Sequence, residues 1–140
     1  MDLIKKIVKY LMIGNIGGLL YCLIEILYRN YTHWTMYFVA FIAFTLIGEL
    51  NEHIEWEMPL WKQMVIGSLI ITSIEFITGM IVNVILGWNV WDYSNMPLNV
   101  MGQICIPFSI VWFFLSLAAI ILDDYLRYWW FGEERPRYYF

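Results

Sequence analysis

The polar stretch of residues 91–104 reads WDYSNMPLNVMGQI and lies between two long apolar segments. Tryptophan and tyrosine favour a membrane–water interface, where the ring is half buried and its polar tip stays hydrated. Proline suits the first turn of a helix, because its missing N–H has no helical partner there. We therefore interpret the stretch as an interfacial loop that leads at Pro97 into a membrane helix. Asp92 and Ser94 are interpreted as turn caps, with the mouth of a binding site as the alternative.

The composition is typical of a membrane protein. Hydrophobic residues make up 61% of the 140 residues and charged residues only 14%, whereas about a quarter of a soluble domain is charged. A spanning helix needs roughly 20 mostly apolar residues. Four segments approach this length, near residues 8–28, 36–52, 63–86 and 98–122, and the second is the least secure because its apolar run is short. We predict one all-α transmembrane domain over residues 1–140, a compact bundle of four helices with a cytoplasmic tail at residues 123–140.

The basic residues predict the orientation. Seven of the eight fall in the N-terminal segment, the second loop and the tail, and only Arg29 falls in the first loop. The seven are Lys5, Lys6, Lys9, Lys62, Arg127, Arg135 and Arg137. By the positive-inside rule we expect both termini in the cytoplasm, in a multi-pass protein of the cell membrane. No basic patch faces one way, so a nucleic-acid partner is not expected.

Small and polar residues recur in the apolar segments at spacings of three and four, which place them on one face of a helix. The residues on these faces are Gly14, Gly18, Tyr21 and Glu25; Ser68, Thr72, Glu75, Gly79 and Asn83; and Asn99, Gly102, Gln103, Ile106, Ser109, Phe113 and Ser116, with a weaker set at Thr45, Glu49 and Glu52. Such residues let membrane helices approach closely. Packing faces are therefore the commoner explanation for the small residues.

The carboxylates in apolar segments are harder to explain by packing. Glu25, Glu49 and Glu75 have no Lys or Arg within a span to pair with them. A charge at the centre of a spanning helix costs about 2.5–3.5 kcal/mol and usually marks a pathway or a proton site. Glu75 is the strongest case, and we expect it to be protonated, because desolvation disfavours the ionised form. A structural hydrogen bond from a protonated Glu75 explains it equally well.

Pro107 is expected inside the fourth helix, where a proline frees the backbone carbonyl four residues earlier, that of Gln103. With the side chains of Asn99 and Gln103, this carbonyl would form a polar pocket in the outer half of the bundle. A simple kink is the alternative. The candidate residues of a substrate or ion pathway are Glu75, Glu25, Asn99, Gln103 and Asn83.

No motif predicts catalysis. Glu49, Glu52 and His53 share a helix face, but a solvated helix end is much commoner than a metal site for such a cluster. The sequence has no nucleophile–base pairing, phosphate-binding glycine loop or zinc-protease motif. We therefore predict no enzyme, no metal and no cofactor.

The run Trp91-Asp92-Tyr93-Ser94 is followed by further motifs at fixed spacings. These are Pro97, Asn99, Gly102-Gln103-Ile104-Cys105, Pro107-Phe108-Ser109 and Trp112. Together they resemble the signature of the putative ABC-transporter type IV family, and the resemblance continues at residues 72–79 and 123–129. It implies a small multi-helix inner-membrane protein of bacteria and their phages, named as a permease and without a proven substrate.

Three functions remain open. The first is a small permease subunit that moves an ion or small solute through a polar site in the outer half of the bundle. Because the chain has no nucleotide-binding motif and few helices, we expect a homo-oligomer or a partner membrane protein beside the lipid bilayer. The second is a non-transporting scaffold or interaction protein. The third, suggested by the resemblance to phage proteins, is a membrane-perturbing factor.

Overall fold

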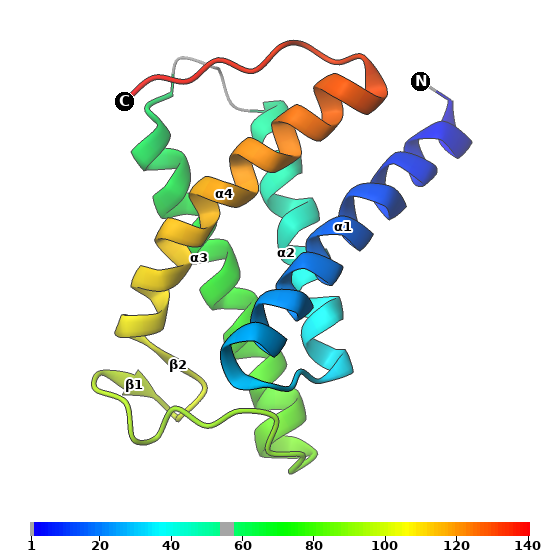
Figure 1. Ribbon diagram of the computed structural model, residues 1–140. Coiled ribbons are helices and arrows are strands. Elements are labelled where there is room, and N and C mark those ends of the chain that lie inside the picture. The colour runs from blue at the N-terminus through cyan, green and yellow to red at the C-terminus, as the bar shows by residue number, and fades with distance from the viewer. Residues whose placement is uncertain (1, 54–57) are drawn as a thin grey trace.

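A computed structural model describes residues 2–53 and 58–140 of the chain, and helices dominate it (Figure 1). The four α-helices are α1 (Leu3–Arg29), α2 (Trp34–His53), α3 (Leu60–Gly79) and α4 (Ile106–Phe131). A π-helix, η1 (Met80–Ile85), continues α3. Two short antiparallel strands, β1 (Asn99–Val100) and β2 (Ile104–Cys105), precede α4. The all-α prediction is confirmed.

Three helices of the described chain are long and apolar enough to cross a membrane, namely Leu3–Arg29, Leu60–Ile85 and Ile106–Phe131. The apolar part of α2, Trp34–Leu50, is shorter. The outer faces of the helices carry exposed apolar side chains, such as Leu19, Leu69 and Phe114. Such faces suit contact with lipid, because hydrocarbon tails are as apolar as the side chains themselves.

Local signals explain where the helices begin and end. The Asp2 carboxylate caps α1 by accepting a hydrogen bond from the Lys5 backbone N–H at 2.9 Å. Helix α1 stops at Asn30 and α4 stops at Gly132, each with a φ of 65°. This left-handed conformation ends a helix because the chain turns away from its axis.

The fourth helix begins at Ile106 and not near residue 98 as predicted. Residues 99–105 form a hairpin in which Asn99 pairs with Cys105. Leu98 and Met101 have φ values of 54° and 55°, which an α-helix cannot contain. The predictions that Pro97 starts the helix and that Pro107 interrupts it were therefore wrong.

Pro107 lies in the first turn of α4, where a proline removes no helical hydrogen bond. The Gln103 carbonyl is not freed by Pro107, and it accepts a hydrogen bond from Trp91 Nε1 at 3.0 Å. Asn99 and Gln103 lie in and beside the hairpin and not on the helix face where we placed them. Helix α4 also extends to Phe131, so residues 123–131 are helical and only the residues after them form a tail.

Close approaches join the helices in pairs. Helix α1 packs on α2 and α3 packs on α4, while α2 also contacts α3 and α4. A side chain at Gly18 would meet the Tyr37 ring at 2.7 Å, and one at Gly67 would meet Ser116 Oγ at 2.5 Å. The backbone therefore approaches its neighbour where a glycine leaves room. This confirms the packing interpretation of Gly18.

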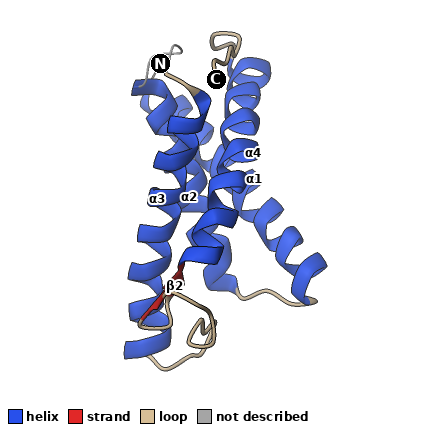
Figure 2. Ribbon diagram, turned by 90° about the vertical axis from the view of Figure 1, so that its left-hand side faces the viewer, coloured by secondary structure: helices blue, strands red, loops and turns tan. Residues whose placement is uncertain are grey.

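Both termini lie at one end of the molecule, and the hairpin lies at the other (Figures 1 and 2). After α4 the chain crosses the first end towards the start of α3 (Figure 1). The Tyr138 hydroxyl donates to Asp124 Oδ2 at 2.8 Å, and the Leu60 N–H donates to the Tyr139 carbonyl at 2.5 Å. The C-terminal segment is thereby fastened to the ends of α4 and α3.

Candidate functional site

Glu75 joins three separate parts of the chain. It lies on α3, and only 3% of the residue is exposed. Its Oε2 accepts a hydrogen bond from the Tyr93 hydroxyl at 2.8 Å, and its Oε1 accepts one from Trp112 Nε1 at 3.2 Å. Tyr93 belongs to the loop before β1, and Trp112 belongs to α4. Within residues 2–53 and 58–140, Glu75 forms no ion pair.

Aromatic rings surround this carboxyl group. The Tyr93 ring stacks on Phe108 with 4.9 Å between the ring centroids. The Tyr21 ring meets Trp112 edge to face at 6.0 Å. Burial, together with the nearby Glu75 carboxylate, raises the pKa of Tyr93 well above its usual range. Its hydroxyl therefore remains protonated and able to donate to Glu75.

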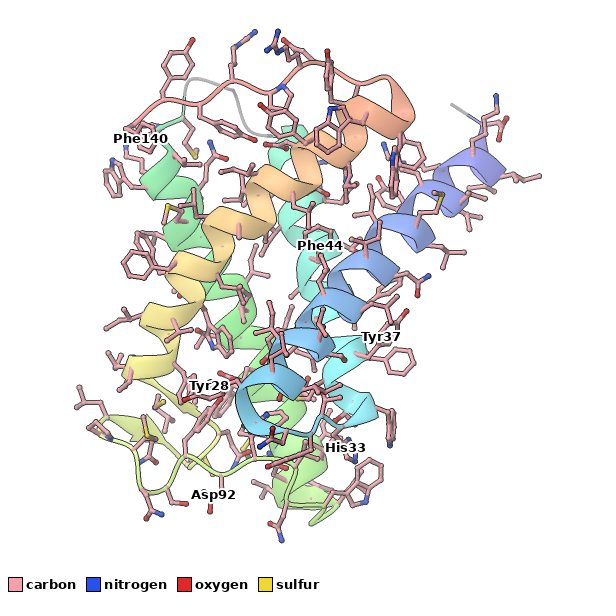
Figure 3. The ribbon with its side chains drawn as sticks, viewed as in Figure 1. Tyr28, His33, Tyr37, Phe44, Asp92 and Phe140 are labelled. Atoms are coloured by element: carbon pink, nitrogen blue, oxygen red, sulfur yellow. The ribbon has the colours of Figure 1, made fainter. Side chains whose placement is uncertain are left out.

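A cavity of about 150 Å³ lies beside Glu75, with walls from all four helices. The described residues that line it are Gly17, Leu20, Tyr21, Ile24, Met36, Val39, Ala40, Ala43, Phe44, Ile47, Ile71, Glu75, Trp112, Leu115, Ala118, Ala119 and Leu122. Figure 3 shows Phe44 about midway between the two ends of the molecule. Glu75 is the only acidic or basic residue among the described residues that line the cavity.

Asn83 and Gln103 hold the loop against the end of α3. Asn83 Nδ2 donates to Gln103 Oε1 at 2.9 Å, and Gln103 Nε2 donates to the Met101 carbonyl at 2.9 Å. Gly79 permits this contact, because a Cβ there would lie 2.6 Å from Gln103 Oε1 and 3.0 Å from the Trp91 ring. Both amide side chains therefore bond to the protein itself.

Asn99 and Asp92 organise the loop internally. Asn99 Nδ2 donates to the Met96 carbonyl at 2.9 Å, and Asn99 Oδ1 accepts from the Gly102 N–H at 3.0 Å. Asp92 accepts hydrogen bonds from the Ser94 hydroxyl and from the Ser94 N–H, and these lower the pKa of Asp92 below its ordinary value of 3.8. The turn-cap interpretation is confirmed for Asp92, which accepts from a backbone N–H, whereas the Ser94 hydroxyl bonds to the Asp92 side chain. Figure 3 shows Asp92 at the hairpin end of the molecule.

Two carboxylates that we expected to lack a cation have one. Glu25 is buried on α1 and pairs with Arg29, four residues later. Glu49 Oε1 lies 3.8 Å from Arg127 Nη2. The prediction was wrong because Arg29 lies one turn from Glu25 on the same helix, and Arg127 of α4 packs beside α2. The side chain of Glu52 lies outside the described residues.

The five candidate pathway residues do not share one cavity. Glu75 lines the cavity, whereas Glu25, Asn83, Asn99 and Gln103 do not. The three amide side chains form hydrogen bonds that hold the loop, and Glu25 forms an ion pair with Arg29 on α1. A membrane pathway through all five would therefore need a different arrangement of side chains.

The sequence did not identify the partners of Glu75. Tyr93 and Trp112 lie 18 and 37 residues away from it in the chain. Periodicity assigns residues to a face of one helix, but it does not assign a partner on another element. The sequence shows the aromatic residues, but which of them bonds to Glu75 depends on tertiary packing.

A second buried polar cluster lies at the end of the molecule that holds the termini. Arg127 Nε donates to Asp123 Oδ2 at 3.0 Å, and both residues are buried. Lys9 Nζ pairs with Glu133 Oε2 at 2.8 Å, and the Glu133 N–H donates to the Arg127 carbonyl at 3.2 Å. The cluster thus ties α1 and α4 to the C-terminal segment. The spacing of four between Asp123 and Arg127 is the sequence signal that could have revealed it.

A family model described as putative ABC-transporter type IV matches residues 8–130. The match extends from α1 into α4 and includes Glu75, its hydrogen-bond partners, the hairpin and every residue that lines the cavity. No solved structure matches the chain.

Proposed function

Because the chain belongs to the putative ABC-transporter type IV family, we propose that this multi-pass membrane protein moves a small organic solute across the membrane without acting as an enzyme. The observation that carries the proposal is the cavity beside Glu75. Three of the four helices that wall it are long and apolar enough to cross a membrane. Intramembrane carboxylates that face a cavity commonly mark a substrate pathway.

The cavity suits an organic solute better than a metal ion. Its walls are aliphatic and aromatic except at Glu75. A calcium ion takes six to eight oxygen ligands, and magnesium keeps several waters. One carboxyl group and two aromatic donors do not supply such a shell. The proposed site therefore lies at Glu75 and not in the polar loop.

Tyr93 offers a link between the cavity and one face of the membrane. Its ring belongs to the loop at the hairpin end, and its hydroxyl reaches Glu75 at 2.8 Å. A movement of this loop would break that hydrogen bond and change the surroundings of the carboxyl group. We assign the hairpin end as the side from which the solute reaches the cavity.

We infer that the protein resides in the plasma membrane with both termini in the cytoplasm. Seven of the eight basic residues fall in the segments at the end of the molecule where the termini lie (Figures 1 and 2), and the positive-inside rule assigns such an end to the cytoplasm. Since the chain lacks a nucleotide-binding motif, coupling to ATP would require a partner chain. A second copy or another membrane protein would complete the pathway.

A scaffold function is the second candidate. It is favoured by the amides of Asn83, Asn99 and Gln103, which form hydrogen bonds within the protein and are not directed at a ligand. A scaffold would keep its role after the cavity is filled, whereas a transporter would not. Filling the cavity therefore separates the two functions.

The test uses purified protein in liposomes and counterflow of three radiolabelled probes that cross lipid slowly. The probes are benzyltrimethylammonium, benzenesulfonate and phenylalanine. Leu115 lines the cavity, whereas Leu46 is an exposed residue of α2 that does not. We expect Leu115→Trp to abolish the uptake of any probe that the wild type accumulates, and Leu46→Trp to retain it. Uptake equal to that of empty liposomes for all three probes, or equal uptake by the two variants, would refute transport.

A further inference from the structure

We propose that the cavity beside Glu75 binds a small monovalent organic cation, an ammonium group with an apolar substituent. The inference rests on the proposed function for its site, but it concerns the chemical class of the ligand and not its movement. It follows from three features of the cavity: its charge, its aromatic surface and its size.

The charge is the most selective feature. Glu75 is buried and has no ion-pair partner in the part of the chain that the structure describes. The neighbouring carboxylate, Glu25, is already paired with Arg29. In the absence of a ligand the buried carboxyl group is expected to be protonated. A cation beside it favours the ionised form, which then carries the one negative charge in this region that no Lys or Arg of the described chain neutralises. A buried charge is strongly destabilising unless it is paired, so a cation is favoured over a neutral or anionic ligand of the same shape.

The hydrogen bonds of Glu75 leave room for such a cation. Each carboxylate oxygen accepts one bond, from Tyr93 or from Trp112, whereas a carboxylate oxygen has two lone pairs. A cation at the carboxylate therefore does not need to displace either donor. The two donors instead hold the carboxylate in place.

Aromatic surfaces lie beside the carboxylate. Tyr21 and Trp112 both line the cavity, and their ring centroids are 6.0 Å apart. The negative face of an aromatic ring attracts a cation, most strongly for tryptophan, and such rings recognise quaternary ammonium groups. A carboxylate next to two aromatic residues therefore favours an ammonium group that carries apolar substituents.

The size and the remaining walls define the rest of the ligand. The cavity is about 150 Å³, and an apolar cavity of roughly 150 Å³ holds a molecule such as benzene. Leu20, Val39, Ala43 and Leu115 are among its walls. A phenyl group or a short branched alkyl chain would fill this space while the ammonium group lies at Glu75.

The experiment is equilibrium dialysis of the full chain in lipid nanodiscs. The probe is benzyltrimethylammonium, and the neutral comparison is N,N-dimethylbenzylamine N-oxide, which has nearly the same shape. Benzenesulfonate is the anionic comparison. We expect the cation to bind about tenfold or more tightly than the N-oxide, because the N-oxide lacks the net positive charge that pairs with Glu75. We expect benzenesulfonate not to bind, because its charge has the same sign as that of Glu75.

Two variants test whether the preference for the cation depends on Glu75. Glu75→Gln is expected to weaken cation binding by about tenfold or more and to leave N-oxide binding unchanged. Glu134→Gln is the matched control, since Glu134 is exposed and does not line the cavity. If Glu75→Gln does not fold, Leu115→Trp serves in its place and should abolish binding of both ligands.

Equal affinity for the cation and the N-oxide, or an unchanged cation affinity in Glu75→Gln, would overturn the inference. Such a result leaves transport of another solute intact. Conversely, selective binding of the cation without counterflow would support the ligand class and contradict transport. The two proposals therefore fail by different results.

Discussion

Glu75 accepts two hydrogen bonds, one from the buried Trp112 and one from the half-buried Tyr93. In Glu75→Ala the Tyr93 hydroxyl and the Trp112 N–H both lose their acceptor. A buried donor left unsatisfied costs about 1–3 kcal/mol, so we expect a clear fall in the thermal unfolding temperature in detergent. Glu75→Gln is the control, because the amide oxygen still accepts from one donor. Equal stability of Glu75→Ala and wild type would contradict these hydrogen bonds.

Gly79 is a second position where one residue controls the site. A methyl group there would lie 2.6 Å from Gln103 Oε1 and 3.1 Å from Gln103 Cβ. Overpacking of this kind costs about 1–3 kcal/mol, so Gly79→Ala should lower the unfolding temperature and loosen the loop from α3. Ser73→Ala, at an exposed position of the same helix, is expected to change stability by less than about 0.5 kcal/mol. If the two variants unfold at the same temperature, the close approach at Gly79 is not present.

At the scale of elements, the loop before β1 is held partly by the Asp92 turn. Hydrogen bonds from Ser94 lower the pKa of Asp92 below 3.8. A depressed carboxyl pKa means that this stabilisation is fully present above the unfolded-state value and is lost as the pH falls through the folded-state value. We expect carboxyl NMR to give a midpoint below 3.8 for Asp92, and Ser94→Ala to raise it. Asn95→Ala, at the exposed neighbouring position, should leave the midpoint unchanged; an unshifted midpoint in the wild type would argue against the turn.

The hairpin also marks the limit of what the sequence predicts about elements. Leu98, Val100, Met101 and Ile104 are as apolar as the helix that follows, so hydropathy extended the fourth helix over them. Short apolar runs do not distinguish a strand from a helix. Leu98 and Met101 are left-handed, and the hairpin that contains them is held by hydrogen bonds from the Tyr93 N–H to the Gly102 carbonyl and from Trp91 Nε1 to the Gln103 carbonyl. A local sequence pattern does not contain these bonds. The apolar helices themselves were predictable, because spanning a bilayer demands long apolar runs.

The candidate site was predictable only in part, because the partners of a side chain on other elements depend on tertiary packing. A carboxyl group within an apolar segment is visible in the sequence, and Glu75 was identified on that basis. Its aromatic partners and the cavity depend on how α1, α2 and α4 pack around α3. The polar amides at Asn83 and Gln103 resembled a binding site, but their hydrogen bonds hold the loop. Residue type alone does not separate an amide that binds a ligand from one that stabilises a fold.

At the scale of the whole molecule, Arg127 of α4 lies at the terminal end, where it pairs with Asp123 of the same helix and approaches Glu49 of α2. Arg127 is 2% exposed and pairs with the buried Asp123. Removing one partner of a buried pair costs about 3–5 kcal/mol, so Arg127→Met should strongly destabilise the fold in detergent. The matched control is Arg137→Met, since Arg137 pairs with Glu134 on the surface and an exposed pair contributes at most about 1 kcal/mol. Similar losses in both variants would show that burial does not strengthen the Arg127 pair.

The most direct test asks whether a solute reaches Glu75. Trp112 is the only tryptophan among the described residues that line the cavity, and its Nε1 donates to Glu75. In protein labelled with 5-fluorotryptophan, the ¹⁹F resonance lost in Trp112→Phe identifies this residue. Titration with benzyltrimethylammonium in nanodiscs should shift the Trp112 resonance saturably, leave that of the exposed Trp129 in place, and produce no shift in Leu115→Trp. A Trp112 resonance that stays fixed, or one that moves together with Trp129, would contradict a solute site in the cavity.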